Sequence, residues 1–139
     1  MTTIEEALEG SSPLATRLRA GGPYRSSAEL VAGMRTVLFE LTEPERIATL
    51  NAHPRIGEDP SRLSARSHQE QGSDQLPELD RLNAEYERRF GFRFVVFVNR
   101  RSKAEVLEVL RQRLERSRQQ EMDEGLRAIV EIAADRLGR

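Results

Sequence analysis

The chain has 139 residues, a length that suits one domain, and its 22 basic and 23 acidic side chains give a formal net charge of −1. This balance argues against binding to nucleic acid or a membrane surface through overall charge, and the absence of cysteine excludes disulfides, thiolate nucleophiles and Cys-ligated metals. No apolar run approaches the ~20 residues that span a bilayer, and the amino terminus does not resemble a signal peptide. We therefore expect a cytoplasmic protein.

Helix starts are marked by a hydroxyl residue followed three positions later by glutamate, which is the capping-box pattern. The pattern occurs at Thr3, Ser26, Thr42 and Ser102. Ser12 followed by Pro13 predicts a further helix, which should end at Gly21–Gly22. The next apolar stripe predicts an amphipathic helix over residues 27–41.

The following helix is expected to end near His53, because Pro54 disfavours helical geometry in the residue before it. Residues 54–63 hold two prolines and a glycine and therefore indicate a loop. A short polar helix that begins at Ser64 and runs to Gln71 should come next.

Residues 77–89 show one apolar face and predict a helix that stops at Gly91. Residues 92–98 (FRFVVFV) are aromatic and β-branched and form the only strand-like segment of the sequence. Since one strand forms no sheet, this segment is either extended chain packed between helices or the start of the next helix. Two long helices complete the chain, so the predicted fold is a single all-α domain over residues 1–139, with about seven or eight helices.

Residues 81–118 carry ten arginines and Lys103 against five glutamates, a local net charge of +6. The signs alternate at helical spacing, which favours a salt-bridged solvent face over a binding stripe. The alternative that stays open is a helical binding module that uses this basic region to hold an acidic partner or RNA. Steep weakening of nucleic-acid binding with salt would support it.

Two histidines are the candidates for proton transfer. His53, at a predicted helix end, either points outward into a site or only caps its own helix. His68 lies in the short polar helix, where a solvated surface position is the alternative. In that helix Ser67 and Glu70 are three residues apart and share a face, so a hydroxyl and a carboxylate can address one ligand. A metal-dependent hydrolase built on His53, His68 and Glu70 is disfavoured, because the two histidines show no metal-ligand spacing.

Four motifs follow one another along the chain: NAHPRIG around His53, SHQEQG from Ser67, LNAEYERRFGFRFV, and a last helix that ends in Arg136–Leu137. Together, from about residue 11 to residue 137, they resemble the 2-oxo-4-hydroxy-4-carboxy-5-ureidoimidazoline (OHCU) decarboxylases of urate degradation. The resemblance implies an all-helical, cofactor-free carboxy-lyase, usually a homodimer, that releases carbon dioxide from a urate-derived ring to leave S-allantoin. Two positions depart from the family pattern: Arg93 replaces the usual proline, and Leu14 replaces an aromatic residue.

The resemblance also assigns site residues by motif match. His53 falls on the catalytic histidine and Glu70 on the catalytic carboxylate. Substrate-contacting positions fall on Pro54, Ser67, His68, Gln69, Gln71, the backbone of Phe94, Val95, Val96, Phe97 and Val98, and Arg136.

We therefore expect His53 to act as general acid/base, with Glu70 orienting it and raising its pKa by favouring the charged imidazole. Arg136 is expected to hold a planar carboxylate through two parallel hydrogen bonds. No metal and no cofactor is predicted, because the imidazoline ring itself can accept the electrons that the departing carboxylate leaves. The expected partners are a small urate-derived substrate and a second copy of the chain, with neither nucleic acid nor membrane.

Overall fold

A computed structural model of the chain describes residues 4–8, 12–53 and 76–138. Its helices are α1 (Ile4–Ala7), α2 (Pro13–Gly21), α3 (Ser27–Glu40), α4 (Glu43–Ala52), α6 (Leu76–Phe90), α7 (Lys103–Arg113) and α8 (Arg118–Leu137). The described residues contain no β-strand, and the predicted all-α class is confirmed. The loop and the short helix expected between Pro54 and Gln71 lie outside the described residues. Where the structure is described, no helix combines the length and the apolar character needed to cross a membrane.

The helices begin where the sequence pattern predicts. Ser12, Ser26, Thr42 and Ser102 each accept a hydrogen bond from the backbone N–H three residues later. At Thr42 and Ser102 the glutamate returns the bond, which completes the capping box. Ser117 starts α8 in the same way with Gln120, a start that a glutamate-only pattern does not reveal. At the other end of a helix, Gly91 follows α6 with a φ of +85°, a conformation that favours glycine.

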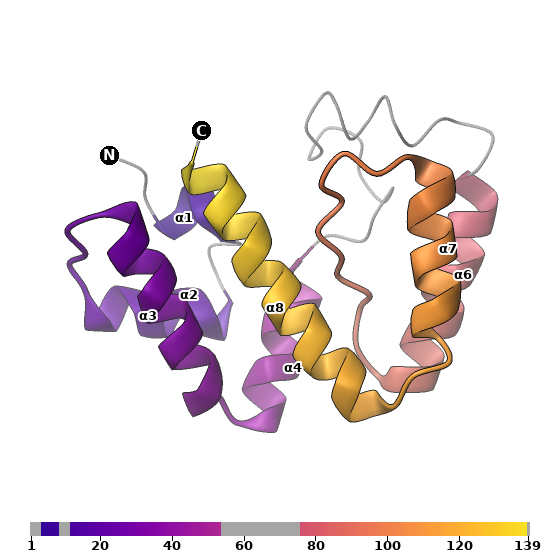
Figure 1. Cartoon of the computed structure of the whole chain (residues 1–139). Coiled ribbons are helices and arrows are strands. Elements are labelled where there is room, and N and C mark those ends of the chain that lie inside the picture. The colour runs from indigo at the N-terminus through magenta and orange to yellow at the C-terminus, as the bar shows by residue number, and fades with distance from the viewer. Residues whose placement is uncertain (1–3, 9–11, 54–75, 139) are drawn as a thin grey trace.

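Helix α8 crosses the middle of the molecule (Figure 1). Helices α1, α3 and α4 contact it, and α2 packs against α1, α3 and α4. On the other side α6 and α7 contact each other, and the extended chain between them runs next to α8 (Figure 1). Residues 92–98 belong to this extended stretch and form neither a strand nor a helix. The structure therefore agrees with extended chain packed between helices, and the interpretation as the start of the next helix is wrong.

Close packing between α4 and α8 fixes the position of the α4 carboxyl end. A Cβ atom at Gly125 of α8 would lie 2.8 Å from Cδ2 of Leu50, so Leu50 packs directly on the glycine, and a larger residue there would require the Leu50 side chain to shift. Leu50 is fully buried and lies three residues before His53. Leu14, the second departure from the family pattern, is also fully buried and fills the core.

Several arginines of the basic stretch form ion pairs within the described residues, and most of them pair with a glutamate of another helix. The pairs are Arg81 with Glu78 and Glu85, Arg111 with Glu78 and Glu108, Arg113 with Glu121, Arg116 with Glu121 and Glu124, and Arg118 with Glu43. The hydrogen bond from Arg111 lowers the pKa of the Glu78 carboxyl below its usual range. The exposed ion pairs of Arg81 and Arg111 agree with the predicted salt-bridged solvent face, whereas the pair of Arg113 with Glu121 is buried.

Candidate active site

His53 closes α4 as its C-cap. Its backbone N–H donates to the carbonyl of Leu50 at 3.2 Å, and its φ of −79° and ψ of 134° turn the chain out of the helix. The imidazole is partly buried, its Nε2 atom is fully buried, and the side chain lines a pocket. The backbone of His53 therefore caps the helix, while the residue also lines the pocket.

This pocket lies where α1, α4, α8 and the start of α2 meet. Its polar lining comes from Ser12, Thr49, His53 and Arg136, and its apolar lining from Ala7, Leu8, Ile129 and Ile132. An apolar wall with a few polar groups is typical of small-molecule sites. The pocket volume is about 10 Å³, which is room for about one water molecule, so it fits one substituent of a ligand and not a whole ring.

Arg136 reaches the pocket from the last turns of α8. Its Nη1 donates to the backbone carbonyl of Ala7 at 3.2 Å, which holds the guanidinium at the pocket wall. A guanidinium in this position can bind a carboxylate through its planar fork. The structure thus brings His53 and Arg136, predicted from opposite ends of the sequence, to one pocket.

Thr49 is a pocket residue that the motifs did not indicate. It precedes His53 by one helical turn, so both side chains lie on the same face of α4. The Thr49 side chain is buried, and its Oγ1 atom has no hydrogen-bond partner among the described residues. The sequence does contain a signal for Thr49, because this hydroxyl residue stands four positions before the candidate histidine.

The predicted backbone contacts at residues 94–98 do not line this pocket. Phe94, Val95 and Val96 are buried, while Phe97 and Val98 are partly buried. Three carbonyls of the segment accept hydrogen bonds from the protein itself: Val95 from Arg113 Nη1 at 2.9 Å, Phe97 from Arg101 Nη1 at 3.3 Å, and Val98 from the Arg101 N–H at 2.9 Å. These three carbonyls already accept hydrogen bonds from the protein, so the substrate contacts predicted for this backbone stay a prediction.

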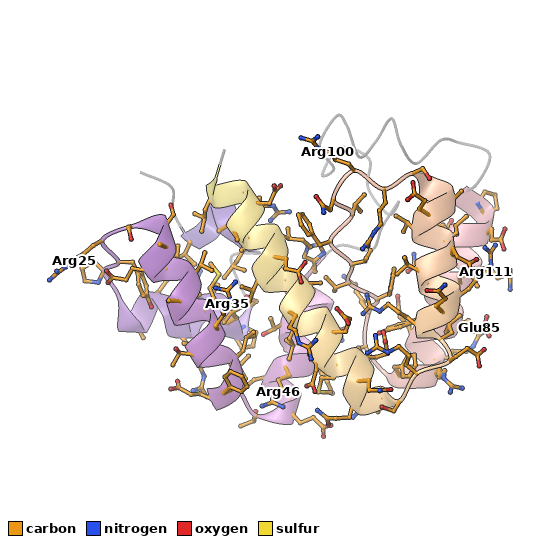
Figure 2. All side chains as sticks on the ribbon, in the orientation of Figure 1. Arg25, Arg35, Arg46, Glu85, Arg100 and Arg111 are labelled. Atoms are coloured by element: carbon orange, nitrogen blue, oxygen red, sulfur yellow. The ribbon has the colours of Figure 1, made fainter. Side chains whose placement is uncertain are left out.

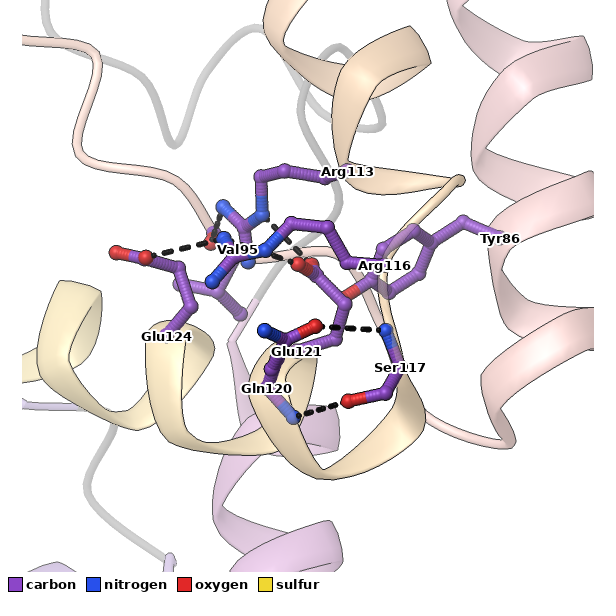
Figure 3. Close-up of polar contacts among 8 residues, drawn as sticks. All are labelled: Tyr86, Val95, Arg113, Arg116, Ser117, Gln120, Glu121 and Glu124. Carbon is purple, nitrogen blue, oxygen red and sulfur yellow. Dashed lines mark hydrogen bonds and ion pairs between the residues drawn. The ribbon is translucent and has the colours of Figure 1, made fainter.

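A buried ionic cluster holds the segment in place (Figure 3). Glu121 is completely buried, and its Oε1 accepts hydrogen bonds from Arg113 Nε and from the Tyr86 hydroxyl, both at 2.7 Å. Burial first, and then the hydrogen bond to Glu121, raise the pKa of Tyr86 well above its usual range, so the phenol stays protonated. The Arg113 guanidinium also lies 4.6 Å from the ring centre of Phe94. The sequence did not reveal this cluster, because Glu121 stands in a polar run (RQQEMDEG) that looks solvated.

Arg93 connects the segment to the end of α4. Its backbone N–H donates to Oδ1 of Asn51 at 2.9 Å, and its Nη1 donates to the carbonyl of His53 at 3.0 Å. Arg93, which departs from the family pattern, therefore contacts the main-chain carbonyl of the candidate histidine.

Several predicted site residues lie outside the described residues, namely Pro54, Ser67, His68, Gln69, Glu70 and Gln71. The pairing of His53 with Glu70 therefore stays a prediction. The part of the chain that is described contains no group of three or more His, Asp or Glu side chains that could hold a metal ion.

The described residues form an all-helical fold in which a histidine and an arginine line one small pocket. The sequence model of the OHCU decarboxylase family matches residues 1–138, and the chain belongs to this family. The family predicted from the motifs is confirmed, and with it the enzyme class, a decarboxylase of urate degradation, at the level of the family.

Relatives and solved structures agree with this assignment. The chain is 31% identical over 140 residues to the 2-oxo-4-hydroxy-4-carboxy-5-ureidoimidazoline decarboxylase of Haloferax volcanii, covering 95% of this chain and 83% of that protein. It is 30% identical over 137 residues to the uric acid degradation bifunctional protein of Bacillus sp. (strain TB-90), covering 93% of this chain but only 27% of that protein. A crystal structure of OHCU decarboxylase in the presence of (S)-allantoin has a TM-score of 0.80 and 28% identity, covering 93% of this chain and 90% of that one.

Proposed function

We propose that this protein converts OHCU into S-allantoin and carbon dioxide without a cofactor, with His53 as general acid/base. The observation that carries the proposal is that His53 and Arg136 line one pocket in a chain of the OHCU decarboxylase family. The crystal structure similar to this chain was determined in the presence of (S)-allantoin, the product of the proposed reaction.

The reaction asks little more of the protein than positioning and one proton. When the bond between ring carbon C4 and the carboxylate breaks, its electron pair passes to the adjacent C=N bond and the carbonyl conjugated with it, which leaves an enol. His53 then delivers a proton to C5, the neighbouring ring carbon that carries the ureido group, while the C4 hydroxyl loses its proton and becomes the carbonyl of S-allantoin. General acid/base catalysis of this kind typically contributes about 10²- to 10⁴-fold to the rate.

Arg136 is assigned to the substrate's charged or carbonyl oxygens, because its guanidinium is fixed at the pocket wall. Glu70 is assigned to orient His53, with Pro54 and residues 67–71 completing the site. In the segment 94–98 we assign the ligand contacts to N–H donors, because carbonyls of this segment accept hydrogen bonds from Arg113 and Arg101.

A coupled assay tests the proposal. Urate oxidase and hydroxyisourate hydrolase generate the unstable substrate, and optical rotation follows the appearance of S-allantoin. His53→Gln should lower kcat by about 10²- to 10⁴-fold, and Glu70→Gln should also lower it. Arg127→Ala, on the exposed side of α8, is the control and should keep the wild-type rate. A His53→Gln protein with wild-type thermal unfolding and wild-type turnover would reject the assignment.

We also infer from the resemblance that the protein works as a homodimer in the cytoplasm. Light scattering of the purified chain should then give twice the mass of one chain. Turnover should survive exhaustive chelation, since no step of the proposed reaction uses a metal.

A further inference from the structure

Arg93 makes two separate contacts with the carboxyl end of α4. Its main-chain N–H binds the side chain of Asn51 at 2.9 Å, and its guanidinium binds the main-chain carbonyl of His53 at 3.0 Å. The two contacts use different parts of Arg93 and reach residues on both sides of Ala52. Together they fix the last residues of α4 against the start of the extended segment.

The guanidinium contact is placed at a position where a cation is favoured. The last carbonyls of a helix have no partner within the helix and carry the negative end of its dipole. The carbonyl that Arg93 binds belongs to His53, the residue whose imidazole faces the pocket. Fixing this carbonyl restricts the backbone from which the imidazole projects.

The rest of α4 is held independently of Arg93. At its amino end Glu43 pairs with Arg118 Nη1 at 2.6 Å, and Arg118 Nε donates to the Phe90 carbonyl at 3.0 Å. In its middle, Leu50 packs directly on Gly125 of α8. Removal of the Arg93 contacts should therefore leave the helix in place and release mainly its last turn and His53.

We propose that Arg93 is a positioning residue for His53. Its two contacts fix the position of His53 relative to the backbone of residues 94–98, which the proposed function assigns to substrate binding. Arg93 belongs to the same extended stretch as that backbone, directly before Phe94, so one residue joins both halves of the proposed site. A misplacement of a catalytic group by about 1 Å can cost about 10²-fold in rate. Loss of the Arg93 contacts should therefore lower turnover more than substrate affinity. The inference rests on the proposed function of His53.

Single and double variants test the two contacts. Arg93→Ala removes the guanidinium contact and keeps the main-chain donor, Asn51→Ala removes the acceptor of that donor, and the double variant removes both. Arg93→Lys keeps a cationic donor. Arg25→Ala is the matched control, because Arg25 is an exposed arginine that points into solvent at the far end of the molecule (Figure 2).

Two readouts separate this inference from the proposed function. The first is steady-state kinetics: Arg93→Ala should lower kcat about tenfold with KM changed less than about threefold, the double variant should lower it further, and Arg93→Lys should restore most of the loss. The second is the NMR signal of the His53 imidazole, which is simple to assign because the chain has two histidines and a His53→Gln variant removes one signal. Arg93→Ala should shift or broaden that signal, and Arg25→Ala should not.

The NMR readout does not depend on turnover, so it decides the inference even if the protein proves inactive on OHCU. An unchanged His53 signal in both Arg93→Ala and the double variant would overturn the inference. So would a loss of kcat that only follows a loss of thermal stability and that Arg93→Lys does not restore.

Discussion

Two regions of this molecule are held together by different means. Helices α1, α3 and α4 pack on α8, and α2 packs on these three helices, through apolar side chains; the fully buried residues there include Leu14, Leu18, Met34 and Leu50. The extended chain that follows α6 also buries apolar side chains, but it is held in addition by arginines that bind its main-chain carbonyls and by the buried cluster around Glu121. The comparison teaches that burial of apolar surface positions the helical body, whereas the extended segment, which has no hydrogen-bond ladder of its own, needs directed polar contacts as well.

The pocket that His53 and Arg136 line lies in the apolar body, and Arg93 connects the extended segment to the end of α4 at His53. Substitutions in the two regions should therefore change the stability of the fold for different physical reasons, and three substitutions test this.

The largest effect is expected at the ionic cluster. Glu121→Gln leaves the Arg113 side chain, which is 7% exposed, buried without its counter-ion. Removal of one partner of a buried pair typically lowers the free energy of unfolding by about 3–5 kcal/mol. Urea denaturation measures the change, and hydrogen exchange should show the extended segment opening more readily, because Arg113 also holds the Val95 carbonyl.

The matched control is Glu124→Gln, one turn further along α8. Its ion pair with Arg116 is partly exposed, so the loss should stay below about 1 kcal/mol. Equal losses for the two variants would mean that the buried cluster does not anchor the segment.

An intermediate effect of opposite sign is expected in the apolar body. Thr49→Val replaces a buried hydroxyl that has no hydrogen-bond partner among the described residues by a methyl group of similar size. Because an unsatisfied buried polar group is costly, the free energy of unfolding should rise by about 1 kcal/mol. Thr36→Val is the control, since Thr36 is exposed on α3 and its hydroxyl binds the Ala32 carbonyl.

A Thr49→Val protein that is less stable than wild type would contradict this account of the pocket. A protein that gains stability but loses kcat/KM would assign the Thr49 hydroxyl to substrate binding.

The smallest effect concerns pH and the surface of the apolar body. The backbone N–H of Thr42, followed by the Arg17 guanidinium, lowers the pKa of Glu45 below its usual value of 4.5. A carboxyl whose pKa is lower in the folded state stabilises the fold above its unfolded pKa, and this contribution is lost as the pH falls through the folded value. Thermal unfolding should therefore occur at a lower temperature at pH 3 than at pH 5, and Glu45→Gln should reduce this difference.

Glu40→Gln, which removes an exposed carboxylate at the end of α3, is the matched control. If Glu45→Gln gives the same slope of Tm against pH as Glu40→Gln, the capping contacts of Glu45 do not contribute to acid sensitivity.

The helix boundaries could be predicted closely because their signals are local. The caps at Ser12, Thr42 and Ser102 involve groups three residues apart, so the pattern in the sequence is the contact in the structure. The end of α4 at His53 was predictable for the same reason, since a proline acts on the residue directly before it. The start of α8 at Ser117 was missed only because glutamine takes the place of glutamate.

The site was predictable only in part. The motifs indicated His53 and Arg136, but the sequence did not show that they share a pocket, nor that Thr49 and Ser12 belong to it. Glu121 and Arg93 were harder still. The sequence around Glu121 is polar and that around Arg93 is aromatic, and neither context tells whether the charged side chain is solvated or buried. That depends on partners that are distant in the sequence.

The sequence by itself determined the all-helical class, the capped starts of α2, α3, α4 and α7, and membership of the decarboxylase family. Only the tertiary structure decided that His53 and Arg136 line one pocket, that Glu121 is buried and binds Arg113 and Tyr86, and that Arg93 binds the end of α4. The physical reason is range: caps, turns and helical periodicity act over three or four residues of chain. A buried polar contact, in contrast, exists only once the apolar faces have packed and removed water from both partners.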